Sequence, residues 1–128
     1  SIYHEMTHFL EFIDTQVMLL DGAMGTQIQG ANLEVEKDYW GQENCSEILN
    51  LSRPDFIQDV HRKYLAAGAD ALETNTFGGS SITLGEFGLE DKTVEINRRA
   101  CELAHEAIAE FKHDGRPRFV IGAIGPGT

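Results

Sequence analysis

Two short segments of this chain end in a carboxylate followed by small or polar residues. Asp21-Gly22-Ala23-Met24-Gly25-Thr26 follows the apolar run at residues 17–20, and Glu73-Thr74-Asn75-Thr76-Phe77 follows residues 69–72. Each run is long enough for one buried strand, and a helical pattern follows both. In parallel α/β proteins the carboxyl ends of the strands share one face, where active sites form. We therefore expect Asp21 and Glu73 to point into one pocket.

The elements that position these acids alternate between helices and strands. Apolar spacing predicts a short amphipathic helix over residues 3–14, and strands are expected at about 17–21, 70–74 and 118–124. A helix should begin near Ser52, which can cap it, and end before Gly68. A short helix before Gly85 and a longer one from about 90 to 111 complete the pattern. The stretch from 22 to 51 is expected to be a long, irregular functional loop or lid.

Strands separated by helices predict an α/β fold with a parallel sheet. A full (βα)₈ TIM barrel takes about 250 residues, and this chain has 128. We therefore expect one partial domain, 1–128, with an N-terminal helix at 1–16 and the first three strands of a barrel at 17–128. A small complete three-layer sandwich is the alternative. As an isolated fragment the chain is expected to self-associate through its open strand edges.

Composition excludes several classes of partner. The chain has 10 basic and 21 acidic residues and a net charge of -11, which disfavours nucleic acid and anionic membrane surfaces. No apolar run is long enough to cross a bilayer, and the N-terminus does not have the pattern of a signal peptide. We expect a cytoplasmic chain in which a disulfide between Cys45 and Cys101 is improbable.

Other polar groups favour structural interpretations. The loop at 78–81 could cradle a phosphate, but without a Walker lysine a plain flexible loop is favoured. The pairs His4/His8 and Cys101/His105 offer two ligands each, too few for a zinc site. The remaining expectations are a core-facing Cys101, a buried or semi-exposed Cys45, a solvated acidic patch, and an aromatic pair that anchors the long loop. The acidic patch is Glu34, Glu36 and Asp38; the aromatic pair is Tyr39 and Trp40.

Three strand-end motifs together resemble the homocysteine S-methyltransferase family, and within it the N-terminal homocysteine-binding module of cobalamin-dependent methionine synthases. These motifs are the segments at 21–26 and 73–77, with Gly122-Ala123-Ile124-Gly125-Pro126 as the third. The resemblance covers nearly all of the chain from residue 17 on.

The resemblance implies methyl transfer to homocysteine to make methionine. In the parent enzyme a zinc ion would bind the thiol as thiolate, and methylcobalamin on another module would donate the methyl group. The family's zinc ligands are three cysteines on later strands, including an adjacent pair that this sequence does not contain. The fragment is therefore expected to bind neither zinc nor cobalamin and to be inactive alone. Its expected partners are homocysteine, the remaining barrel strands and the folate and cobalamin modules.

Homocysteine is a zwitterion, and its two charges suggest which residues bind it. Its ammonium needs a carboxylate, for which Asp21 is the first candidate, and its carboxylate needs N–H donors, which the backbone of Gly22 and Ala23 could supply as a small nest. Glu73 and Asn75 could complete the polar wall. Thr74 and Thr76 are weaker candidates, since alternate strand residues point oppositely and only one pair should face the pocket.

Two other functions remain open. One is a homocysteine methyltransferase with a betaine or S-methylmethionine type of donor and no cobalamin. The other is a non-catalytic, self-associating α/β module whose acidic strand ends are structural.

Overall fold

The computed structural model describes residues 2–22 and 24–125. Its two strands are β1 (Ala71–Glu73) and β2 (Phe119–Ile121). The described helices are α1 (Ile2–Thr15), α2 (Met24–Gln29), α3 (Val35–Asp38), α4 (Leu49–Ser52), α5 (Pro54–Ala66), α6 (Ser81–Gly85) and α7 (Thr93–Ala109), with 3-10 turns η1 (Ser46–Ile48), η2 (Glu90–Lys92) and η3 (Lys112–Asp114). The helices expected near residues 3–14, before Gly85 and after Glu90 are therefore confirmed.

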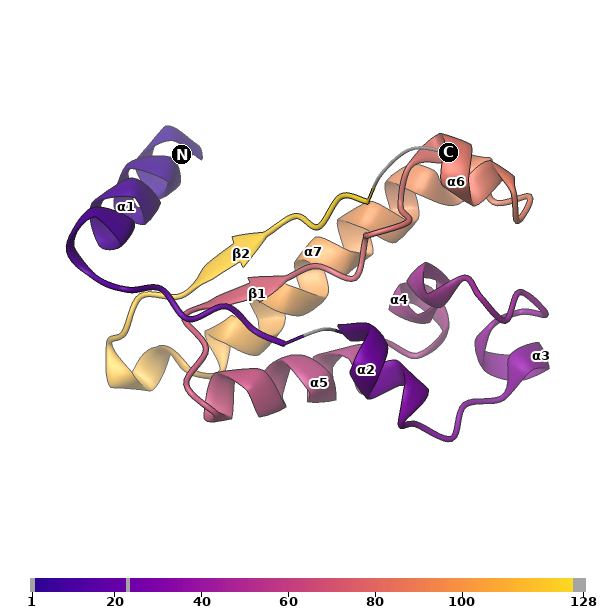
Figure 1. Cartoon of the computed structure of the whole chain (residues 1–128), viewed down its shortest axis with the longest axis horizontal. Coiled ribbons are helices and arrows are strands. Elements are labelled where there is room, and N and C mark those ends of the chain that lie inside the picture. Colours follow the sequence, from indigo (N-terminus) through magenta and orange to yellow (C-terminus); the bar gives the residue numbers. More distant parts are fainter. Residues whose placement is uncertain (1, 23, 126–128) are drawn as a thin grey trace.

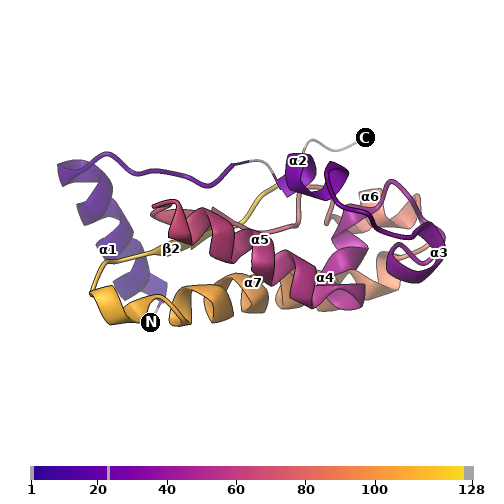
Figure 2. The same ribbon diagram turned by 90° about the horizontal axis from the view of Figure 1, so that it is seen from below.

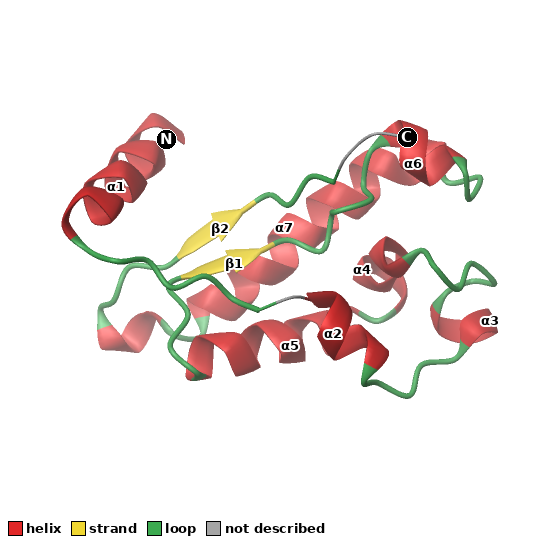
Figure 3. Ribbon diagram, viewed as in Figure 1, coloured by secondary structure: helices red, strands yellow, loops and turns green. Residues whose placement is uncertain are grey.

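The parallel sheet predicted from the alternating pattern is confirmed, although its strands are short (Figure 3). Ala71 of β1 pairs with Phe119 of β2, and Leu20 forms an isolated parallel bridge to Ala71 on the other side. The spatial order is thus the segment around Leu20, then β1, then β2. This places the chain segments that carry Asp21 and Glu73 side by side (Figure 1).

The strand expected at 17–21 is reduced to that single bridge. The Leu19 N–H donates to the Asp70 carboxylate at 2.9 Å instead of to a strand carbonyl, so the ladder does not extend toward the N-terminus. The strand expected at 118–124 ends at Ile121 for a related reason. Beyond it, the hydroxyls of Thr74 and Thr76, rather than backbone groups, bond the Ala123 backbone.

Helices α5 and α7 lie along one side of the strands and pack on each other (Figure 2). The apolar stripe of α5 buries Ile57, Val60 and Leu65. Leu65 of α5 and Leu72 of β1 pack with Ala104 and Ala107 of α7. Burial of aliphatic surface in this layer is the main favourable contribution to folding, and it fixes the position of β1 beneath the cleft.

Helix α1 lies beside β2 (Figure 1), where two of its aromatic rings hold it. Phe9 and Phe12 both meet Phe119 edge to face, with ring centroids 5.5 Å apart in each pair. Such pairs contribute about 1 kcal/mol each beyond the area that they bury. The amphipathic pattern over residues 3–14 is therefore used to dock this helix at the start of β2.

The sequence suggested an irregular loop from 22 to 51, but this stretch contains α2, α3, η1 and most of α4. Ile28, Tyr39 and Leu49 from these pieces are buried in one cluster with Ile57 and Leu103. Tertiary packing thus stabilises helices that are too short to be stable alone. Tyr39 anchors the segment as expected, whereas Trp40 is exposed.

Three expectations for single residues were wrong. Ser52 does not cap α5: it ends α4, its hydroxyl donates to the Asp38 carbonyl, and α5 begins at Pro54 without a side-chain cap. Asp38 is not solvated but buried, and its carboxylate accepts the Glu34 N–H at 2.8 Å. Cys101 is exposed, because Ala100 and Ala104 occupy the inward face of α7, whereas Cys45 is buried as expected.

Gly68 follows α5 with φ of +105°, which confirms its expected role after the helix. Among the described residues, no helix is both long and apolar enough to span a membrane.

Candidate functional site

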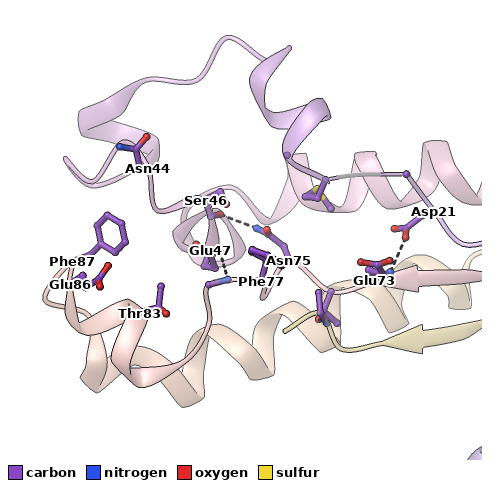
Figure 4. Close-up of a pocket in the computed structure, with 16 residues that line it drawn as sticks. Asp21, Asn44, Ser46, Glu47, Glu73, Asn75, Phe77, Thr83, Glu86 and Phe87 are labelled. Atoms are coloured by element: carbon purple, nitrogen blue, oxygen red, sulfur yellow. Dashed lines mark hydrogen bonds between the residues drawn. The ribbon is translucent and has the colours of Figure 1, made fainter. Parts of the chain in front are cut away.

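A cleft of about 510 Å³ opens at the carboxyl ends of the strands (Figure 4). The segment after Leu20, the end of β1, the η1 turn and α6 all contribute to it. Its lining residues are Asp21, Gly22, Met24, Gly25, Asn44, Ser46, Glu47, Glu73, Thr74, Asn75, Phe77, Gly78, Thr83, Glu86, Phe87 and Ala123. The pocket predicted from the two acidic strand ends therefore exists, with both acids in its wall.

Asp21 is fixed to β1 by its backbone and its side chain. Its N–H donates to the Ala71 carbonyl at 3.1 Å, and its Oδ1 accepts the Glu73 N–H at 3.1 Å. The pKa of Asp21 is raised from 3.8 to about 6: partial burial is the main cause, the N–H bond from Glu73 lowers the pKa, and the nearby Glu73 carboxylate raises it. The carboxyl group is therefore mostly ionised at pH 7 and is stabilised by any cation that binds beside it.

The side chains of residues 73–76, at the end of β1 and just after it, alternate in direction. The hydroxyls of Thr74 and Thr76 lie 2.6 Å apart, and Thr76 donates to the Ala123 carbonyl at 2.8 Å, so this pair ties β1 to the end of β2. Glu73 is exposed beside Asp21, and the buried Asn75 donates to the Ser46 carbonyl at 2.9 Å (Figure 4). Glu73 and Asn75 thus lie in the cleft wall, and Thr74 also lines it.

Gly22 has a packing role that its sequence context did not reveal. A Cβ at this position would lie 2.5 Å from the Tyr64 Oη and 2.7 Å from its ring, so any side chain here would force Tyr64 of α5 to move. Ala23, the second expected member of the anion nest, lies outside the described residues.

The loop at 78–81 is not a plain flexible loop. The Gly78 N–H donates to the Glu47 carboxylate at 2.8 Å, and the Asn97 side chain of α7 donates to the Gly79 carbonyl at 2.8 Å. The Ser80 hydroxyl accepts the Thr83 N–H and so caps α6. The loop is held from both sides, and its first residue, Gly78, forms part of the cleft wall.

Several cleft residues were not identified from the sequence. Glu47 is buried in η1, and Asn44, Thr83, Glu86 and Phe87 form the end of the cleft away from Asp21 (Figure 4). These residues come from short helices and turns without a periodic pattern, and no spacing signal marks them.

The electrostatics of the cleft are one-sided. Four carboxylates line it, and its lining includes no Lys, Arg or His. Such a wall attracts an ammonium or another cation and repels a free carboxylate. An anionic end of a ligand would therefore have to be bound by neutral donors, which are backbone N–H groups and the amide and hydroxyl side chains of the lining.

The described residues do not fit a zinc site. No group of three His, Cys, Asp or Glu side chains among them is placed to hold a metal ion. Burial, together with the nearby Glu47 carboxylate, raises the pKa of the Cys45 thiol to about 11, so that this sulfur keeps its proton. Cys101 is exposed on α7, away from the cleft.

Comparisons with known proteins place this geometry in a family. A sequence model of the homocysteine S-methyltransferase family matches residues 18–128. The chain is 43% identical over 122 residues to methionine synthase of Mycobacterium tuberculosis, and equally to that of Mycobacterium leprae. These matches cover 95% of this chain but 10% of each relative. The chain therefore spans about a tenth of the length of the curated relatives that it matches.

Solved structures show the same fold. The metallated form of the homocysteine methyltransferase MmuM from Escherichia coli matches with a TM-score of 0.70 and 25% identity, over 89% of this chain and 40% of that one. Its oxidised form matches with a TM-score of 0.72 at the same identity, over 90% and 39%. The α/β fold is thus that of a TIM-barrel family. With the family match over residues 18–128, the chain belongs to the homocysteine S-methyltransferase family.

Proposed function

We propose that the cleft binds the amino-acid end of homocysteine, within an enzyme that methylates the homocysteine thiol to make methionine. One observation carries this proposal: Asp21 and Glu73, from neighbouring segments, meet at the strand ends in a cleft lined by carboxylates and no cation. An α-ammonium group matches this charge, and family membership supports an amino acid as its source.

In this proposal each residue has a separate role. Asp21 accepts a charge-assisted hydrogen bond from the substrate ammonium, and Glu73 adds a second carboxylate beside it. The backbone N–H groups of Gly22 and Ala23 bind the substrate carboxylate as neutral donors, in a cleft that no cationic side chain lines. Asn75 completes the polar wall. Because Asp21 is half-buried, its bond to the ammonium should be stronger than a fully exposed ion pair.

We further propose that the chain supplies the first three βα units of a barrel in a larger methyltransferase. The resemblance implies zinc and cobalamin for that whole protein, but the described residues of this chain have no donor set for zinc. The role proposed for this chain is to hold and orient the amino acid. The methyl donor stays open between methylcobalamin and the betaine or S-methylmethionine type.

The proposal is tested by removing one charge from each side of the contact. Homocysteine and its des-amino analogue 4-mercaptobutyrate are titrated calorimetrically into the complete protein that carries this sequence, as wild type and as Asp21→Asn. A hydrogen bond to a charged group contributes about 1.5–3 kcal/mol, so homocysteine should bind the variant roughly 10- to 100-fold more weakly. Binding of the analogue should hardly change. Equal losses for both ligands would refute the ammonium contact.

Self-association of the isolated chain stays a prediction. It is supported by the high exposure of apolar side chains next to the sheet, including Val17 at 85% before the Leu20 bridge and Ile124 at 90% after β2. Sedimentation velocity of residues 1–128 over a range of concentrations tests it, and a monomer at every concentration would contradict it.

A further inference from the structure

Buried and partly buried hydrogen bonds join the η1–α4 segment to the loop that follows β1. The Asn75 side chain donates to the Ser46 carbonyl at 2.9 Å, and the Asn50 side chain donates to the Asn75 carbonyl at 2.8 Å. The Gly78 N–H donates to the Glu47 carboxylate at 2.8 Å. The Asn50 bond is buried and the other two are partly buried, so breaking any of them leaves a polar group poorly solvated, and together they hold the loop at residues 75–78.

Glu47 is the acidic member of this set. Its side chain is buried, with Oε1 on the Gly78 N–H and Oε2 3.8 Å from the Cys45 sulfur (Figure 4). Gly78 approaches it so closely that an added Cβ would lie 2.9 Å from Oε1. Both oxygens of Glu47 therefore have partners within the protein, which distinguishes it from Asp21 and Glu73 at the other end of the cleft.

The loop that Glu47 holds is part of the proposed binding wall. Asn75 and Gly78 line the cleft, and Phe77 between them accepts the Gly125 N–H through its carbonyl at 2.7 Å. A shift of Gly78 would thus move Asn75 on one side and the segment after β2 on the other. A displacement of about 1 Å can remove a large part of what a binding group contributes to affinity.

We propose that Glu47 is a positioning residue for homocysteine binding: it acts through the Gly78 N–H, which sets the place of the loop at residues 75–78, and not by contact with the ligand. This inference rests on the proposed function, since it concerns the affinity of the same cleft. Nothing in the family match or in the spacing of the sequence points to Glu47.

The test compares two substitutions that differ in one hydrogen bond. Glu47→Leu leaves the partly buried Gly78 N–H without its acceptor, whereas Glu47→Gln keeps an oxygen for it and removes the charge. In the complete protein, calorimetric titration with homocysteine should show a loss of about tenfold for Glu47→Leu, and Glu47→Gln should recover most of it. Glu43→Leu, at an exposed glutamate four residues earlier, is the matched control and should bind as wild type does.

Unchanged homocysteine binding in Glu47→Leu would overturn the proposal. A loss in Glu47→Gln as large as that in Glu47→Leu would also overturn it, because the charge of Glu47 would then act on the ligand itself. If Glu47→Leu does not fold, Gly78→Ala serves instead: its Cβ pushes on the same carboxylate, and it should also weaken binding. Wild-type protein that fails to bind homocysteine, or Asp21→Asn that binds normally, would refute the proposed function. Normal binding in Glu47→Leu alone would refute only this inference.

Discussion

Mild acid should destabilise this chain through His61 of α5. The imidazole is fully buried, and neither ring nitrogen has a hydrogen-bond partner in the described structure. Burial lowers its pKa from 6.5 to about 4, because the charged form would lose its hydration without gaining an acceptor. The informative perturbation is therefore a change of pH, compared between wild type and His61→Leu.

The sign and size follow from proton linkage. Above pH 6.5 the ring is neutral in both folded and unfolded chains, and stability is at its full value. Between pH 6.5 and about 4 the unfolded chain binds a proton that the folded chain does not, so the free energy of unfolding falls as pH falls. At about 1.4 kcal/mol for each pKa unit the total loss is about 3 kcal/mol, of which about 2 kcal/mol falls between pH 7 and 5.

Hydrogen exchange of peptides from α5, corrected for the intrinsic pH dependence of exchange, gives the free energy of opening in the complete protein. Wild type should lose about 2 kcal/mol between pH 7 and 5, and His61→Leu should lose much less. The difference between the two proteins isolates His61 from other groups. Asp21 has a raised pKa, so its contribution favours folding at low pH and is lost as pH rises from about 4 to 6. The same pH dependence in both proteins would refute a buried, unpaired imidazole.

Three further outcomes are expected. Homocysteine affinity should fall as pH drops through about 6, where Asp21 becomes protonated; calorimetric titration at pH 5 and 7.5 measures this, and equal affinities would contradict it. The Asp70 carboxylate accepts hydrogen bonds from the Leu19 N–H at 2.9 Å and from the Arg116 side chain at 2.8 Å. Asp70→Ala removes both and should lower the free energy of unfolding by about 2 kcal/mol in urea titration. A loss below about 0.5 kcal/mol would contradict a stabilising role for these two bonds. Gly22→Ala should cost about 1–3 kcal/mol by the same assay, because its Cβ would overlap the Tyr64 ring; an unchanged midpoint would show that this contact relaxes freely.

The periodic parts of the fold were predictable, because their pattern and their packing agree. The stripe of α5 and the long apolar repeat of α7 face the strands as their spacing indicates. The two acidic strand ends also meet as expected, since parallel strands bring their carboxyl ends together. Local sequence and tertiary structure favour the same arrangement there.

The aperiodic parts were not predictable from spacing. The helices within residues 22–51 exist because Ile28, Tyr39 and Leu49 pack on α5 and α7, which no local pattern shows. Glu47 was missed for the same reason: its partner, Gly78, is 31 residues away. The cap expected at Ser52 failed because its hydroxyl finds the Asp38 carbonyl instead. In each case a long-range contact decided the structure.

A crystal structure of the complete protein with homocysteine bound would test the assignment of the cleft most directly. We expect the amino nitrogen within about 3 Å of the Asp21 carboxylate, with Glu73 beside it and the substrate carboxylate on the backbone N–H groups that follow Asp21. Homocysteine bound elsewhere, or in this cleft with its carboxylate toward Asp21 and Glu73, would contradict the assignment.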